Sequence, residues 1–318
     1  MSAYLEIKNL QIGFRTYEGN KQVLNIEHIA IDRGETYGLV GESGAGKTVL
    51  ALTILNLLPA ASALVNNGEI CFDGENLLAK TQKEMRELYR GKRISMIFQD
   101  PMSTLNPVFT VGQQVGRVLQ YHRGLSGKEL ENKSFETLEM VKLPDASSVL
   151  HKYPHELSGG QRQRVIIAIA LSCGAEFLIA DEPTRNLDVT IQAGILKLIN
   201  ELQRDLKISV LFIANNMGLV NVICKNIGIL YRGKIIETGP SQQLIHNHFH
   251  PYTDALISAI PRDKSEKLKF ASAIVRPDAA GGCPYYSRCP QAMDECVQKE
   301  PLLEKLDGSH QVACFLPR

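Results

Sequence analysis

The stretch GESGAGKT (residues 41–48) holds residues whose types and spacing suit the binding of nucleotide phosphates. It fits the pattern G-x-x-x-x-G-K-[ST]. Glycines at positions 44 and 46 allow backbone N–H groups to turn towards phosphate oxygens, Lys47 brings a positive charge, and the Thr48 hydroxyl can ligate Mg²⁺. The predicted nucleotide contacts are Gly41, Ser43, Gly44, Ala45, Gly46, Lys47 and Thr48.

A second stretch, EFLIADEP (residues 176–183), ends an apolar run in two adjacent carboxylates. Asp181 at the end of a strand suits Mg²⁺ coordination, directly or through water. Glu182 is one residue further on, where it could polarise an attacking water. An acidic pair at a strand end is common by itself. Beside a phosphate-binding loop it favours nucleotide hydrolysis.

The elements that must position these residues can be read from the apolar pattern. The strand YGLV precedes the phosphate-binding loop and the helix KTVLALTILNLL follows it. Short β-branched runs alternate with helix-length stretches, which predicts an α/β core with a mainly parallel sheet. Residues 76–156 are polar and helix-prone, which predicts an inserted helical region. Residues 262–282 have the composition of a linker.

Composition excludes several classes of protein. The 318 residues are 44% hydrophobic and 22% charged, which is typical of a soluble globular chain. The net charge of +1 predicts no nucleic-acid partner. The beginning, MSAYLEIKNL, predicts no signal peptide. Apolar runs such as VIIAIAL (residues 165–171) are too short to cross a bilayer, so any membrane role is expected to be peripheral.

Four of the seven cysteines, Cys283, Cys289, Cys296 and Cys314, occupy the last 36 residues with the spacing C-x5-C-x6-C-x17-C. The other three lie in apolar surroundings, as expected for small buried side chains. Without an export signal a reducing compartment is expected, so a metal or cluster site is favoured over disulfides. A [4Fe–4S] cluster, Zn²⁺, and free or oxidised thiols remain open, and the wide spacing favours the cluster. HNHFH (residues 246–250) is interpreted as a solvated face rather than a metal site.

A third motif, LSGGQRQR (residues 157–164), distinguishes among families with a phosphate-binding loop. With the other two motifs, it resembles the ATPase subunits of ABC transporters. The resemblance implies two subunits facing head to tail, with Ser158, Gly159, Gly160 and Gln161 contacting the partner's ATP. It also implies that Gln99, in FQDPMSTLNP (residues 98–107), reaches Mg²⁺ and water. Tyr17 is the candidate for stacking on adenine, with a strand-end tyrosine as the alternative.

The segments YPHELSGGQRQRV, IADEPTRNLDVTIQAGIL, HPYTDALISAIP and CPYYSRCPQAMDEC resemble the oligopeptide/dipeptide/nickel branch of bacterial ABC importers. This resemblance covers residues 3–316. It implies an α/β P-loop NTPase cassette at residues 1–240, with an antiparallel β subdomain and a helical subdomain at about residues 76–165. A C-terminal extension at residues 241–318 carries the cysteine motif of residues 283–314. Similar extensions in this branch are associated with an iron–sulfur cluster. A structural role is expected for it, since nothing in the nearby sequence suggests electron transfer.

The same resemblance implies the partners and the location. ATP and Mg²⁺ are the expected cofactors, besides the cluster or zinc. The expected partners are a second, non-identical ATPase subunit, two transmembrane permease subunits and an extracytoplasmic substrate-binding protein. The expected location is the cytoplasmic face of the bacterial cell membrane, and peptides are the expected cargo. The alternatives are nickel or metal-chelate import, a soluble ABC protein of translation or DNA repair, and a regulatory scaffold subunit.

Two positions depart from the family pattern. Relatives present a histidine after the strand that follows the acidic pair, but this chain has Asn215, and no histidine occurs between residues 156 and 245. Asparagine cannot become cationic as imidazole can. TRNLD (residues 184–188) stands where TTALD is usual, so Arg185 and Asn186 enlarge this loop. Neutral drift is the alternative, but the two changes favour a hydrolytic site weakened in this subunit alone.

Overall fold

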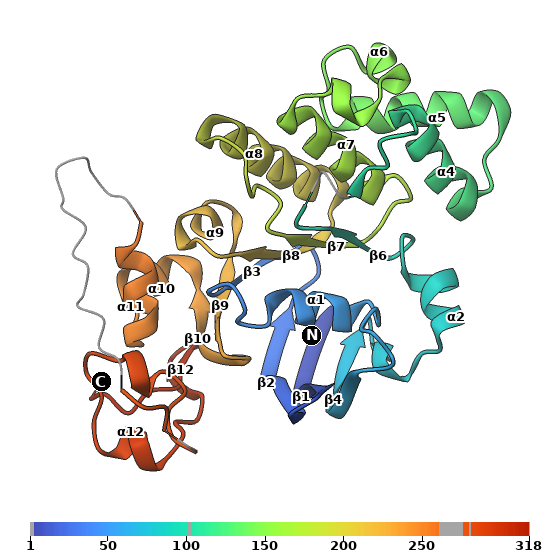
Figure 1. Ribbon diagram of the computed structural model, residues 1–318. Coiled ribbons are helices and arrows are strands. Elements are labelled where there is room, and N and C mark those ends of the chain that lie inside the picture. The colour runs from blue at the N-terminus through green and yellow to red at the C-terminus, as the bar shows by residue number, and fades with distance from the viewer. Residues whose placement is uncertain (1–2, 101–103, 261–275, 280, 318) are drawn as a thin grey trace. The chain divides into compact units, whose positions relative to one another are not determined.

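The computed structural model describes residues 3–100, 104–260, 276–279 and 281–317 (Figure 1). The chain divides into two compact units. The first unit consists of Met1–Ile31, Thr36–Leu78 and Ala214–Arg318, and the second consists of Asp32–Glu35 and Ala79–Ile213. Residues 101–103 of the FQDPMSTLNP segment and most of the predicted linker lie outside the described residues.

The first unit contains an antiparallel sheet with the strand order β2-β1-β4-β5. Its strands are β1 (Leu5–Thr16), β2 (Gly19–Ile31), β4 (Ala63–Phe72) and β5 (Glu75–Asn76). Leu5 and Ile7 are buried, and the buried positions then change phase to Leu10 and Ile12. Asn9, with a φ of 47°, lies where the register with β4 shifts, so an irregularity at this residue moves the apolar face by one position.

The first unit also contains strands in the order β11-β12-β10-β9-β3. They are β3 (Thr36–Val40), β9 (Asn226–Tyr231), β10 (Lys234–Pro240), β11 (Glu304–Asp307) and β12 (His310–Val312). β3 runs parallel to β9, whereas β10 is antiparallel to its neighbours. All five residues of β3 are buried, as expected for a central parallel strand.

Short helices accompany these strands: α1 (Lys47–Ile54), α9 (Met217–Ile223), α10 (Ser241–His246), α11 (Pro251–Ser258) and α12 (Glu295–Gln298). Gly38 in β3 shows how closely α9 packs. A Cβ atom at this position would lie 2.1 Å from Val220 Cγ1. The missing side chain therefore lets the helix approach the strand that leads to the phosphate-binding loop.

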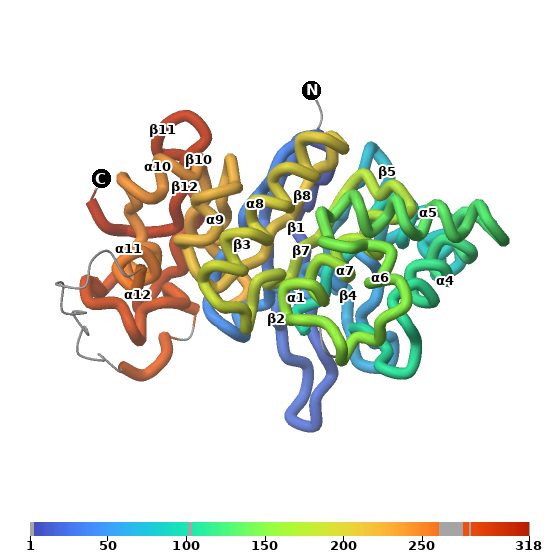
Figure 2. The backbone as a smooth tube through the Cα atoms, turned by 90° about the horizontal axis from the view of Figure 1, so that it is seen from above, coloured from blue at the N-terminus to red at the C-terminus, as the bar shows by residue number. Residues whose placement is uncertain are grey.

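The second unit is built on three parallel strands in the order β8-β7-β6. They are β6 (Ile94–Ile97), β7 (Phe177–Asp181) and β8 (Ser209–Ala214). Helices α7 (Gly159–Leu171) and α8 (Val189–Leu206) cover one face (Figures 1 and 2). Other α-helices among the described residues of this unit are α2 (Gln82–Glu84), α4 (Val111–Arg123), α5 (Gly127–Met140) and α6 (Ala146–His151). A π-helical turn, Met85–Tyr89, follows α2, and a 3-10 turn, Pro154–Glu156, precedes α7.

In its described residues, the helical region predicted for residues 76–165 contains α2, α4, α5 and α6, the first turns of α7, and the strand β6. The run ISMI is only four residues long, too short to stand out in a polar stretch. The boundary between the cassette and the C-terminal extension, predicted after residue 240, coincides with the end of β10. This division into domains stays a prediction. Among the described helices, none has the length and hydropathy needed to span a membrane.

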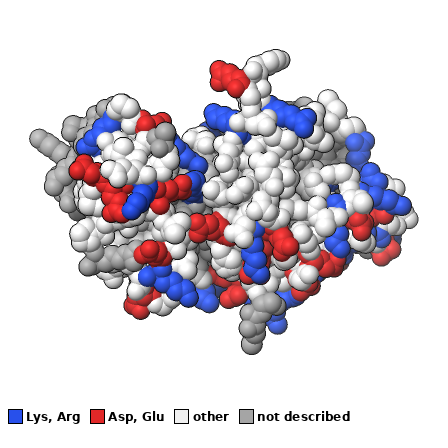
Figure 3. Space-filling model, turned by 90° about the horizontal axis from the view of Figure 1, so that it is seen from below, with Lys and Arg blue, Asp and Glu red and all other residues white. Residues whose placement is uncertain are grey.

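Basic and acidic side chains are interspersed on the face drawn in Figure 3. This distribution accords with the near balance of 35 Lys and Arg against 34 Asp and Glu in the sequence. The attraction of a charged ligand to this protein therefore depends on local charged groups and not on the net charge.

Candidate functional site

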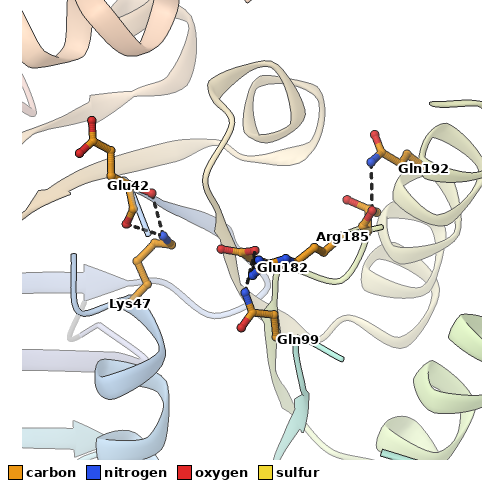
Figure 4. Close-up of polar contacts among 8 residues, drawn as sticks. Glu42, Lys47, Gln99, Glu182, Arg185 and Gln192 are labelled. Carbon is orange, nitrogen blue, oxygen red and sulfur yellow. Dashed lines mark hydrogen bonds and ion pairs between the residues drawn. The ribbon is translucent and has the colours of Figure 1, made fainter. Parts of the chain in front are cut away.

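The phosphate-binding loop closes around Lys47 (Figure 4). Lys47 is 5% exposed, and its Nζ donates hydrogen bonds to the main-chain oxygens of Gly41 at 2.7 Å and Glu42 at 3.0 Å. The ammonium is thus held inside the turn of the loop, at the first residue of α1. A helix beginning and a fixed cation together make a site for a polyphosphate.

Two positions of the loop require glycine for steric reasons. Gly46 adopts a φ of 109°, and a Cβ atom there would lie 2.6 Å from Leu24 Cδ2. Gly41 has an ordinary φ, but its Cβ would lie 2.2 Å from the main-chain oxygen of Leu230. Ser43 and Thr48 are exposed residues, so a ligand can approach this side of the loop.

In the second unit, Gln99 and Arg185 both contact the carboxylate predicted to polarise water (Figure 4). Gln99 Nε2 donates to Glu182 Oε2 at 2.9 Å, and Arg185 Nη1 lies 3.2 Å from the same oxygen. Gln99 follows β6 and Glu182 follows β7, so the carboxyl ends of two adjacent parallel strands bring them together. Asp181 ends β7 and is 1% exposed. This edge of a parallel sheet is the usual place for catalytic groups.

The loop after Glu182 is tightly turned. Glu182 itself has a φ of 46°, in the left-handed region that is unfavourable for a glutamate, and its N–H donates to Ile213 O at 3.0 Å. Arg185 N–H donates back to Glu182 O at 3.0 Å. Asn186 has a φ of 61°, a conformation that asparagine tolerates well. The substituted Asn186 therefore suits its backbone, and the turn directs Arg185 to Glu182.

The LSGGQ segment begins helix α7. Ser158 is the N-cap residue and accepts from the N–H of Gln161 at 3.3 Å, while Gln161 Oε1 accepts from the N–H of Ser158 at 3.0 Å. This reciprocal pair is a capping box. Gly159 is exposed, and a Cβ atom at Gly160 would lie 2.9 Å from Ile191 Cγ2 in α8. The segment thus presents a rigid, exposed helix beginning.

The two asparagines after β8 have different roles. Asn216 is the N-cap residue of α9, and its Oδ1 accepts from the N–H of Gly218 at 2.7 Å. Asn215 is an exposed residue in the bend between Ala214 and Asn216. Asn216 therefore has a structural explanation. Asn215 stands, exposed, at the position where relatives are expected to present histidine.

Tyr17, the candidate for adenine stacking, lies between β1 and β2, which continue as a long hairpin (Figure 2). Its side chain is fully exposed. It has no protein surface to stack on and stays a prediction.

Contacts that the motifs did not predict reach the phosphate-binding loop from the C-terminal part of the first unit. Tyr252 Oη in α11 accepts from the N–H of Glu42 at 2.8 Å. Arg288, beside Cys289, donates to both carboxylate oxygens of Glu42. The partners are 210 and 246 residues apart, and no spacing in the sequence signals them.

The four C-terminal cysteines line one pocket together with Tyr285. Burial, with smaller contributions from the charges of the other three cysteines, raises the pKa of the Cys283 thiol to about 11. Within the part of the chain that is described, however, no group of three or more His, Cys, Asp or Glu side chains is arranged to hold a metal ion. A metal site at these cysteines is therefore not confirmed.

Of the HNHFH histidines, His246 is exposed, as a solvated face predicts, but His250 is 2% exposed. Burial lowers the pKa of His250 to about 4, so this ring is neutral at pH 7. Its Nδ1 accepts from the N–H of Tyr252 at 3.0 Å and caps α11. His250 is thus a buried cap, and the solvated interpretation is wrong for it.

Comparison with known proteins covers almost the whole chain. Residues 24–185 match the ABC transporter family, and residues 236–296 match the oligopeptide/dipeptide transporter C-terminal region. The chain is 42% identical to the probable peptide ABC transporter ATP-binding protein y4tR of Sinorhizobium fredii, over 98% of this chain and 94% of that protein. It is 40% identical to the dipeptide transport ATP-binding protein DppD of Bacillus subtilis, over 99% of this chain and 95% of that protein.

Solved structures agree with the fold. The dimeric ATP-binding cassette MJ0796, bound to ADP and Pi, superposes with a TM-score of 0.66 at 26% identity, covering 74% of this chain and 98% of that one. The cassette cbiO1 of Clostridium perfringens gives the same TM-score and identity, covering 78% of this chain and 92% of that one. The chain therefore belongs to the ABC transporter family, in the oligopeptide/dipeptide branch of its ATP-binding proteins.

Proposed function

We propose that this chain is the ATP-binding subunit of an importer for dipeptides or oligopeptides. The observation that carries the proposal is the loop of residues 41–48 closed around Lys47, whose Nζ is 2.7 Å from Gly41 O. Such a loop suits MgATP, with Lys47 on the phosphates and Thr48 on Mg²⁺. The peptide cargo is supported by full-length relatives whose names specify peptide transport.

The chain would work in an assembly at the cytoplasmic face of the bacterial membrane. Its partners would be a second, non-identical ATPase, two transmembrane permease subunits and an extracytoplasmic binding protein. The exposed beginning of α7 supports the ATPase pairing, because Ser158 and Gly159 are accessible to a nucleotide held by another subunit. ATP would bring the two cassettes together, and its hydrolysis would separate them.

Hydrolysis of ATP at this chain's own loop would be weak. Asn215 supplies at most a neutral hydrogen bond where an imidazole would stabilise developing charge. Arg185 lies 3.2 Å from Glu182 Oε2, the atom to which Gln99 also donates. A cation at that oxygen competes with the water that Glu182 would have to polarise. The two departures therefore act against the same step.

Glu182→Gln in the reconstituted transporter tests whether this chain's own site hydrolyses ATP more slowly than the partner's site. We expect it to change the overall ATP turnover by less than about twofold, because the partner's site carries hydrolysis. The equivalent change in the partner should lower turnover by about 10²–10³-fold. Glu176→Gln, which alters a glutamate paired with Arg93 away from the loop, is the matched control. If Glu182→Gln stops turnover as completely as the partner's change, the two sites are equal.

We further propose that the four C-terminal cysteines hold a [4Fe–4S] cluster of structural role. The support is that Cys283, Cys289, Cys296 and Cys314 line one pocket. Burial first, and the charges of the neighbouring cysteines second, raise the pKa of Cys283, so bare thiolates are unfavourable in this pocket. A cationic cluster offsets both effects. The alternative occupant of such a thiolate set is Zn²⁺.

Anaerobic purification decides between the two. We expect about four iron and four sulfide per chain, and a visible absorbance that dithionite bleaches. Cys296→Ser should lose this signal, whereas Cys71→Ser, a change of a half-buried cysteine in β4, should keep it. Protein that contains zinc and no iron would show that these cysteines hold Zn²⁺ and not a cluster.

A further inference from the structure

Glu42, the second residue of the phosphate-binding loop, is held on two sides by C-terminal residues of the first unit. Its N–H donates to Tyr252 Oη at 2.8 Å. Its carboxylate accepts from both terminal nitrogens of Arg288, with Nη1 to Oε2 at 2.7 Å and Nη2 to Oε1 at 2.9 Å. A two-point arginine–carboxylate pair fixes orientation as well as charge.

Contacts of its own segment hold Arg288 in place. Its N–H donates to Tyr285 O at 3.0 Å, and Tyr285 is 4% exposed. The Tyr285 ring packs on Tyr231 and Tyr252, with centroids 5.1 Å and 5.3 Å apart. The aromatic cluster therefore joins the segment before Cys289 to the helix that contacts the loop.

The pair matters because of where Glu42 lies. Its main-chain oxygen accepts from Lys47 Nζ, while its side chain points away from Lys47 (Figure 4). A free carboxylate in a loop that binds a polyphosphate repels the ligand, since both are anionic. Arg288 remains a cation at every relevant pH, and the ion pair with Glu42 raises its pKa further.

We propose that Arg288 is a positioning residue of the nucleotide site, which neutralises Glu42 and holds its carboxylate away from the ATP phosphates. The proposal rests on the proposed binding of ATP to this loop. It makes the cysteine-bearing segment a determinant of nucleotide affinity. Because Arg288 and Glu42 are 48% and 42% exposed, the effect is that of a surface pair, about two- to fivefold in affinity.

The test measures the Kd for ATP of the full-length chain by calorimetry. Arg288→Ala should weaken binding about two- to fivefold, and the loss should shrink as salt is raised. The double variant Arg288→Ala/Glu42→Gln should return the Kd to near that of the unaltered chain, because the exposed charge is gone. Arg288→Lys should retain most of the affinity.

A matched control is Asp278→Asn, which breaks another ion pair of the C-terminal segment, Arg232 Nη1 to Asp278 Oδ1 at 2.9 Å, without changing a loop residue. It should leave the Kd unchanged. An unchanged Kd in Arg288→Ala overturns the proposal, and so does a weakened Kd that Glu42→Gln does not restore, which marks a purely structural role. Failure of the unaltered chain to bind ATP would instead refute the proposed nucleotide site.

Discussion

Lys47→Ala is expected to abolish measurable ATP binding by the full-length chain, with a Kd at least about 10²-fold higher. Each hydrogen bond between a charged donor and phosphate contributes about 1.5–3 kcal/mol, and this side chain can reach two phosphates. The loop holds Nζ 2.7 Å and 3.0 Å from two main-chain oxygens. Lys47 is the only basic residue in the sequence of residues 41–48, so no other cation of the loop can replace it. Calorimetric titration with MgATP measures the change.

The control for this change is Lys197→Ala, an exposed lysine on α8, which should leave the Kd unaltered. Thermal unfolding of Lys47→Ala should show a folded chain, because the loop glycines and the hydrogen bond from Gly233 N–H to Ala45 O remain. Retention of the original affinity in a folded Lys47→Ala chain would place the nucleotide elsewhere.

Asn215→His is expected to raise hydrolysis at this chain's own site by about 10–100-fold. The imidazole supplies the charged contact that asparagine lacks, and one such contact typically contributes about 10²–10³ in rate. The full increase requires Arg185→Thr as well, because Arg185 otherwise keeps its place 3.2 Å from Glu182 Oε2. The measurement uses an assembly whose partner carries the inactivating Glu→Gln change, so that only this site turns over.

Asn216→His is the matched control for this prediction. It places the same side chain one residue later, but removes the cap of α9, where Oδ1 accepts from Gly218 N–H at 2.7 Å. We expect no gain in hydrolysis and a loss of about 1 kcal/mol in the free energy of unfolding. If Asn215→His/Arg185→Thr hydrolyses ATP no faster than the unaltered subunit, the weak site has another cause.

The chemistry of the loop and the family were predictable from the sequence, because each motif is a short contiguous segment. Residues 41–48 and 157–161 contain their own turn glycines, their own cap and their own helix beginning. The parallel strands were predictable for a similar reason, since β3 and β7 are uninterrupted buried runs. The strand β6 and the buried His250 were not, because four residues or one side chain carry too little pattern.

The polar partners of those motifs were decided only by the tertiary structure. Arg185 was visible as an unusual residue, but its contact with Glu182 depends on the left-handed backbone at Glu182 and Asn186. The hold of Arg288 on Glu42 joins residues 246 positions apart. Motifs are local because the backbone of a few residues makes them. Charge pairing across the fold depends instead on which distant segments pack together, and only the folded chain settles that.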